Sequence, residues 1–221
     1  MMRQVFTRDL RLAMRRPGDV ISTVGFFLMI ATLFPLAIGP DSKMLALMTS
    51  SILWIAVLLA SLPSFDRLFV DDYYTGFLDR LVISNAALWE YALVRIISHF
   101  CIMGLPLIAA LPIMALFFAI PLSALPLLAL IIAVGLFALT LLGAIAASLT
   151  LGARRASLLS AILILPLAFP IVIFGTLASQ AVLEGQDYSA HFALLGASCL
   201  ILLVVSPAAT FYALRYAIEE R

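Results

Sequence analysis

Few side chains in this chain are of types that do acid–base or metal chemistry. The two histidines, His99 and His191, lie on different segments. His99 is in an apolar stretch, with Arg95 one helical turn before it and Glu90 earlier still. An ionisable group inside a membrane-spanning stretch indicates a ligand or proton site, so His99 is a candidate, together with the nearby Arg95. Glu90 is expected on a solvated face, and the alternatives are a pair with Arg95 or a place in a cytoplasmic gate. For His99, near the end of its stretch, we favour the alternative of a neutral imidazole bonded to a neighbouring helix.

The sequence patterns of common catalytic and cofactor sites do not occur. An HExxH zinc site needs two histidines four residues apart, and a serine nucleophile commonly sits in a G-x-S-x-G turn. The sequence also has no glycine-rich P-loop for ATP and no C-x-x-C-H for covalent haem. We therefore expect no catalytic residue, no metal site and no nucleotide site, and hence no enzyme. An intramembrane enzyme with His99 as its base is the less favoured alternative.

Composition assigns the chain to the membrane proteins. It is 65% hydrophobic and only 11% charged, with a mean hydropathy of +1.19 over 221 residues. Such a chain has too little polar surface to cover a water-soluble core, so lipid is its natural solvent. Six uncharged stretches are long enough to span a bilayer: residues 20–38, 44–62, 96–118, 124–151, 157–183 and 192–214. The expected fold class is all-α, a polytopic membrane protein with six transmembrane helices in one domain, 1–221.

The third, fourth and fifth stretches exceed the minimum length and hold residues that bend helices. We expect these helices to tilt, or to bend at Gly104, Pro106, Pro112, Pro166 and Pro170. Such prolines serve equally well as hinges or as static kinks, and the sequence does not choose between them.

Basic residues are divided very unevenly between the two sides of the membrane. If the six stretches alternate in direction, all 13 lysines and arginines except Lys43 fall on the side that holds both termini. Because lysine and arginine favour the cytoplasmic side, we expect both termini in the cytoplasm. The net charge of +1 averages two different faces and implies no nucleic-acid partner.

Residues 1–18, before the first stretch, have a helical pattern of their own. Apolar residues recur on one face and arginines on another: Met2, Phe6, Leu10 and Ala13 against Arg8, Arg11 and Arg15. This pattern predicts an interfacial helix, with its arginines among lipid headgroups and its apolar side in acyl chains. The alternative is a basic tail that only sets the topology.

Residues 65–84, between the second and third stretches, combine acids with aromatic side chains. Burying the charges of FDRLFVDDYYTGFLDRL in hydrocarbon would cost about 2.5 to 3.5 kcal/mol each, so this segment must lie outside the bilayer. It is nevertheless too apolar for a freely solvated loop, and Phe77, Leu78, Leu81 and Val82 fall on one face of a short helix. That face must lie against protein, either elsewhere in this chain or on a soluble partner. The residues alone leave both alternatives open.

Several stretches together resemble one family. These are FFLMIATLFPLAIGP, LWIAVLLASLPSFDRLFVDDYYTGFLDRL, SLLSAILILPLAFPIVIFG and SPAATFYALR, in order over nearly the whole chain. They are similar to the cytochrome c maturation protein B family, CcmB, also called haem exporter protein B. The resemblance implies a six-helix, ABC-2 exporter-type permease of the bacterial inner membrane.

The resemblance also implies partners. ATP would be bound by a separate ATPase subunit, CcmA, and the membrane subunits CcmC and CcmD would complete the complex with this chain, with or without a second copy of it. Haem would be handled by the complex and delivered to the periplasmic chaperone CcmE. The function implied is either haem delivery or ATP-driven release of the loaded chaperone. The alternative is a membrane scaffold that holds the haem-handling subunits without transport.

The site residues implied by the resemblance lie in residues 65–84, named here the coupling segment. In such families this segment docks on the ATPase, and the matching residues are Asp71, Asp72, Gly76, Phe77, Leu78, Asp79 and Leu81. Many relatives have glutamate where this chain has Asp79. The tryptophan-rich haem-handling motif of CcmC is missing, since the only tryptophans are Trp54 and Trp89. The cofactor-binding residues of this chain are therefore unassigned.

Overall fold

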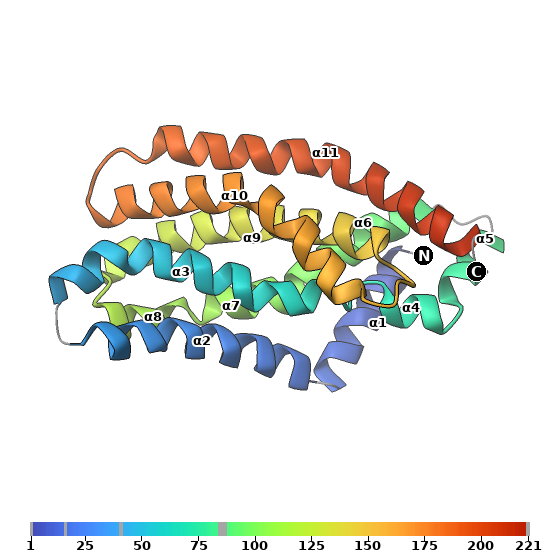
Figure 1. The fold of residues 1–221 in the computed structure, drawn as a ribbon, viewed down its shortest axis with the longest axis horizontal. Coiled ribbons are helices and arrows are strands. Elements are labelled where there is room, and N and C mark those ends of the chain that lie inside the picture. The colour runs from blue at the N-terminus through green and yellow to red at the C-terminus, as the bar shows by residue number, and fades with distance from the viewer. Residues whose placement is uncertain (1, 16, 40–41, 84–87, 220–221) are drawn as a thin grey trace.

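The computed structural model describes all residues except 1, 16, 40–41, 84–87 and 220–221, and within this part of the chain it is helical with no strand (Figure 1). The first half contains α1 (Met2–Arg15), α2 (Gly18–Ile38), α3 (Ser42–Phe65), α4 (Val70–Tyr74), α5 (Phe77–Ile83) and α6 (Leu88–His99). The second half contains a π-helical turn η1 (Phe100–Gly104), α7 (Leu105–Ala109), α8 (Leu111–Phe118), a 3-10 turn η2 (Leu122–Ala124), α9 (Leu125–Leu149), α10 (Ala156–Leu183) and α11 (Ser189–Glu219).

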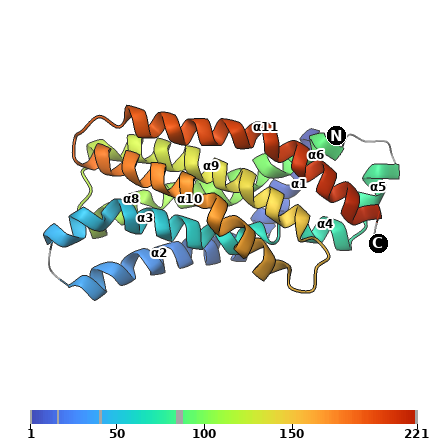
Figure 2. The same ribbon diagram turned by 45° about the horizontal axis from the view of Figure 1, so that its top comes forward.

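The six predicted spans are confirmed as helical segments long and apolar enough to cross a membrane. They are Gly18–Ile38, Met44–Tyr74, Leu88–Phe118, Leu122–Leu149, Ala156–Leu183 and Ser189–Glu219. The helices extend beyond the uncharged stretches, because polar residues at their ends continue the same backbone hydrogen bonding. Both termini lie at one end of the bundle together with α1, α4 and α5 (Figures 1 and 2). We call this the arginine-rich end.

The third span is broken into pieces, as its prolines and glycine predict. Pro106 and Pro112 occupy the first turns of α7 and α8, where a missing N–H costs least. Gly104 closes η1, and a Cβ there would come within 2.8 Å of the Phe100 ring. In contrast, Pro166 and Pro170 lie inside the single helix α10, which changes direction along its length (Figure 1).

Trp54 of α3 is the largest fully buried side chain, and it ties three spans together. Its indole ring lies against Gly135 of α9 and Gly175 of α10, where any Cβ would overlap the ring. Its Nε1–H donates a 2.9 Å hydrogen bond to Ser179 Oγ of α10. Two glycines therefore create the space for the ring, and a serine satisfies its one polar group.

A second buried cluster lies toward the arginine-rich end. Its members come from α1, the coupling segment, α6, α9 and α11, and include Val5, Phe69, Leu78, Tyr91 and Leu214. Helix α1 packs directly against α6. The coupling segment is therefore folded onto the bundle rather than extended from it.

Candidate functional site

The coupling segment forms two short helices joined by a tight turn, and Ser84 at its end lies outside the described residues. Gly76 separates α4 from α5 with a φ of +69°, a conformation that favours glycine. The Arg80 guanidinium donates hydrogen bonds to the carbonyls of Thr75 and Gly76, both at 3.3 Å. Gly76 is thus explained by the turn itself, which fixes the angle between α4 and α5.

The predicted apolar face of α5 exists, and it packs within this chain. Leu78 is only 1% exposed and Leu81 is also buried, both in the second cluster, while Phe77 is half-buried. The side chain of Val82 is outside the described part. Of the two alternatives left open by the sequence, packing on the chain itself accounts for Leu78 and Leu81. The exposed residues of the segment include Asp71, Tyr74 and Thr75 of α4 and its turn, and Arg80 of α5.

Beneath this surface lies a set of charged and polar side chains, named here the ion-pair cluster, which is buried except for the partly exposed Arg8 and Arg95. Its members are Arg8 and Asp9 of α1, Asp72 of α4, and Tyr91 and Arg95 of α6. Arg8 Nη2 lies 2.9 Å from Asp9 Oδ1 and 2.9 Å from Asp72 Oδ2. Arg95 Nη1 lies 2.8 Å from Asp9 Oδ2, and Arg95 Nε lies 3.5 Å from Asp72 Oδ2. The Tyr91 hydroxyl donates a 2.5 Å hydrogen bond to Asp72 Oδ2.

The cluster also holds the backbone and ring of the coupling segment. Arg95 donates from Nε to the Leu68 carbonyl at 3.1 Å and from Nη2 to the same oxygen. The Arg8 guanidinium carbon lies 4.5 Å from the centre of the Phe77 ring, a cation–π contact. Three separate parts of the chain, α1, the coupling segment and α6, are therefore joined at one point.

Electrostatically the cluster is balanced, with two arginines and two aspartates. Burial lowers the pKa of the Arg8 guanidinium, but the hydrogen bonds and charges of Asp72 and Asp9 raise it by more, so its pKa lies above the usual arginine value. Arg8 thus stays charged. Asp72, predicted as a docking residue, has its carboxylate buried against these partners and is not part of the free surface.

Arg95 pairs with Asp9 and Asp72, so the pair with Glu90, one alternative for that residue, does not form. Residues five apart on a helix point in different directions, whereas those three or four apart are neighbours. The apolar side of α1 was expected in acyl chains, and part of it packs on protein instead, because Val5 and Phe6 lie in the second cluster, whereas Met2 and Leu10 are exposed. Asp9 at the centre of that side is only 3% exposed and reaches Arg95, which draws α1 onto the protein.

His99 contacts a neighbouring helix, as the favoured alternative predicted. Its Nε2 lies 3.2 Å from Ser64 Oγ of α3, and its ring centre lies 5.7 Å from that of Phe65. A small cavity of about 170 Å³ adjoins it between α1, α2, α3 and α6, and Asp9, Arg67 and Arg95 also line it. His191 lies in the first turn of α11 at the opposite end of the bundle, so the structure does not bring the two histidines together.

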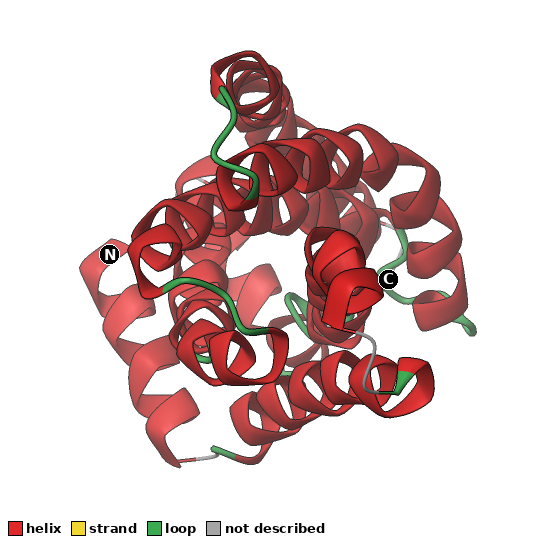
Figure 3. Ribbon diagram, turned by 90° about the vertical axis from the view of Figure 1, so that its left-hand side faces the viewer, coloured by secondary structure: helices red, strands yellow, loops and turns green. Residues whose placement is uncertain are grey.

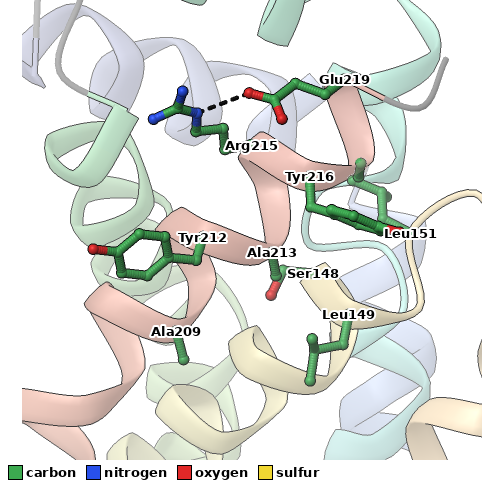
Figure 4. A pocket seen from close by; sticks show the side chains of 10 residues that line it. Ser148, Leu149, Leu151, Ala209, Tyr212, Ala213, Arg215, Tyr216 and Glu219 are labelled. Atoms are coloured by element: carbon green, nitrogen blue, oxygen red, sulfur yellow. Dashed lines mark hydrogen bonds and ion pairs between the residues drawn. The ribbon is translucent and has the colours of Figure 1, made fainter.

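A larger cleft, of about 720 Å³, lies between the end of α9 and the last turns of α11 (Figure 4). Leu149 and Ala213 contribute apolar walls, and Tyr216 lines it as well. Arg215 Nε donates a 2.9 Å hydrogen bond to Glu219 Oε1 at its edge. Among the described residues there is no group of three or more His, Cys, Asp and Glu side chains that could hold a metal ion.

Sequence reasoning missed Arg8, Asp9 and Tyr91 as site residues, and missed the role of Trp54. One signal for the cluster was present. Val5, Asp9 and Ala13 follow one another at a spacing of four, which puts an acid in the middle of the apolar face of α1. A buried carboxylate needs a cationic partner, and that requirement points to an arginine on another segment.

Comparison with known proteins gives a consistent result along the whole chain. A family model described as CcmB protein matches residues 1–217. The chain is 36% identical over 217 residues to heme exporter protein B of Haemophilus influenzae, covering 98% of both chains. It is 39% identical over 213 residues to heme exporter protein B of Bradyrhizobium diazoefficiens, covering 96% of both, and 38% identical over 216 residues to that of Escherichia coli K12, covering 98% of both. The chain belongs to the CcmB family.

Proposed function

We propose that this chain is the membrane permease subunit of an ABC-type complex in haem export and cytochrome c maturation, with both termini in the cytoplasm of a bacterium and the bundle in its inner membrane. A separate ATPase subunit, CcmA, docks on the coupling segment. Its ATP-driven movement serves haem delivery or release of the haem-loaded chaperone CcmE, together with CcmC and CcmD. The names of the relatives and the membership in the family support the haem-export part.

One observation carries the coupling part of this proposal: the ion-pair cluster joins the coupling segment to α1 and α6. A displacement of α4 is transmitted to α6 through Asp72, which pairs with Arg95 and accepts a hydrogen bond from Tyr91. Helix α6 continues through η1, α7 and α8 to the far end of the bundle. A short element held by packed side chains and a network of ion pairs transmits displacement better than a solvated loop, because it moves together with the helix it contacts.

The docking surface in this proposal is the exposed part of the coupling segment. Tyr74 is 65% exposed and its ring contacts that of Tyr73 edge to face, with 5.3 Å between ring centres. Asp71 lies beside it as an exposed acid. An aromatic anchor bordered by charge is the usual composition of a protein interface. Leu78 and Leu81 then hold this surface from beneath, and Gly76 sets its shape.

The test is co-purification of CcmA with the full-length chain carrying Tyr74→Ala and Asp71→Ala. We expect ATPase binding to fall by about tenfold or more, as for loss of an aromatic anchor. Tyr212→Ala is the matched control, because Tyr212 is 69% exposed on α11. Charging Leu78 would not serve, since it would disturb the second cluster whether or not the ATPase docks there. Unchanged ATPase binding in the double variant would refute docking at α4.

Transmission of the movement from α4 to α6 is tested separately with Asp72→Asn, because the Asp72 side chain is buried beneath the proposed docking surface. Because the substitution also lowers stability, co-purification of CcmA first verifies that the complex assembles, and ATP-driven release of the loaded chaperone should then be lost in the assembled complex. If complexes with an inactive ATPase still release the chaperone, the scaffold alternative is correct and the coupling proposal fails.

A further inference from the structure

Helix α1 carries an acid on its inner side and arginines on its outer side. Asp9 is buried in the ion-pair cluster, and Arg8, on the arginine face and partly exposed, reaches Asp9 and Asp72. Arg3, Arg11 and Arg15 are exposed, and no ion pair between described residues involves any of them. Arg11 and Arg15 are one helical turn apart and therefore share a face. Three cations thus remain available to a partner outside the chain.

The position of α1 relative to the bilayer follows from its connection to α2. Helix α1 ends at Arg15, and the first span begins at Gly18. Its last turn must therefore lie at the boundary of the bilayer, where headgroups are found. Figure 3, which looks along the bundle, shows the helix next to the N label at the rim of the ring of helices. Its outer side faces away from the protein.

Apolar side chains accompany the free arginines on the exposed part of α1. Met14 is 68% exposed, and Leu10 and Leu12 are also exposed. Packing of α1 on α6 thus leaves an amphipathic outer surface with arginines and apolar groups side by side. Such a surface suits the boundary between headgroups and acyl chains, because arginine extends its charge to phosphate while apolar groups enter the hydrocarbon.

We propose that the outer face of α1 is a binding surface for anionic phospholipids, with Arg11 and Arg15 contacting the phosphates and Arg3 adding to the positive potential. Their charge complements an anionic headgroup, and Met14 and Leu10 bury against its acyl chains. Since Arg8 and Asp9 belong to the same helix, a lipid bound there also steadies the ion-pair cluster. Lipid binding at this face does not depend on ATPase docking.

The experiment measures binding of short-chain phosphatidylglycerol and of matched phosphatidylcholine to the detergent-purified full-length chain by native mass spectrometry. The wild-type chain should prefer phosphatidylglycerol. Arg11→Gln with Arg15→Gln should lower the affinity for phosphatidylglycerol by about fivefold for each arginine, or about 25-fold for both. The affinity for phosphatidylcholine should stay unchanged. Raised salt should reduce the preference, because these charges are exposed.

Two further variants make the result specific. Arg154→Gln with Arg155→Gln removes the same charge from the exposed loop between α9 and α10, and it should leave the affinity within about twofold of wild type. Arg11→Lys with Arg15→Lys keeps the charge and should restore most of the binding. An equal loss in the loop variant, or no loss in the α1 variant, would overturn the proposal. Circular dichroism of each variant verifies that the helices remain intact.

Discussion

The Tyr91 hydroxyl of α6 donates a 2.5 Å hydrogen bond to Asp72 Oδ2 of α4, and the same oxygen accepts from Arg8 of α1. Replacing Tyr91 with phenylalanine removes only the hydroxyl, because the ring keeps its contacts with Phe69 and Phe77. We expect Tyr91→Phe to lower the free energy of unfolding by about 1.5–3 kcal/mol, the range for a hydrogen bond to a charged group. Reversible unfolding in mixed detergent micelles measures this, and an unchanged midpoint would contradict the bond.

Asp72 is the acid on which both arginines of the cluster converge. Asp72→Asn leaves Arg8 and Arg95 with one carboxylate between them, and breaking such a buried pair costs about 3–5 kcal/mol. Asp71→Asn, at the exposed neighbour, should change stability by less than about 0.5 kcal/mol. Adding Arg8→Gln to Asp72→Asn restores the charge balance and should recover part of the loss. A double-mutant cycle in which the two effects simply add would show that the residues are not coupled.

Gly175 accommodates the Trp54 ring, so a methyl group there should force the ring out of place. We expect Gly175→Ala to destabilise the protein by about 1–3 kcal/mol through overpacking. Gly196→Ala on α11 is the matched control, because nothing lies within 4 Å of its Cβ and the gain in helix propensity is the same. In a Trp54→Leu background, Gly175→Ala should no longer lower the melting temperature further, because the overlapping ring is gone. Equal melting temperatures for the two alanine variants would be incompatible with this packing.

Asp187 caps the start of α11. It accepts hydrogen bonds from the Ser189 backbone N–H at 2.9 Å and from the Ser189 hydroxyl at 2.8 Å, and these lower the pKa of its carboxyl group. Because the folded pKa is below the unfolded one, this stabilisation is complete above about pH 4 and is lost as the pH falls through the folded value. Hydrogen exchange should show the first turn of α11 opening at low pH. Asp187→Asn should abolish that pH dependence, and its persistence would exclude the cap as the cause.

His99 serves packing and one hydrogen bond in this structure. His99→Phe keeps a ring against Phe65 but removes the contact with Ser64, so we expect a loss of about 1 kcal/mol and full function in the assembled complex. The measurement is complementation of cytochrome c maturation in cells that lack the native protein. Complete loss of maturation with normal protein levels would revive a chemical role for this side chain.

The polar residues show how much of this fold can be predicted from the sequence. Six helical spans follow from long apolar stretches with few charges, because each charge buried in hydrocarbon would add to the cost of crossing the membrane. The same arithmetic predicts that residues 65–84 lie outside the bilayer, and the periodicity of Phe77, Leu78 and Leu81 correctly indicates a short helix with one apolar face. Proline chemistry likewise determines where the third span breaks.

Only the tertiary structure decides what those faces meet. Arg8 and Asp72 are separated by 64 positions in sequence, and no local pattern says that they bond. Nor does spacing show that Leu78 packs within the chain, or that Gly135 and Gly175 are small because Trp54 lies between them. Hydropathy and helical period are properties of one segment, whereas an ion pair or a fitted ring depends on how several segments approach one another in space.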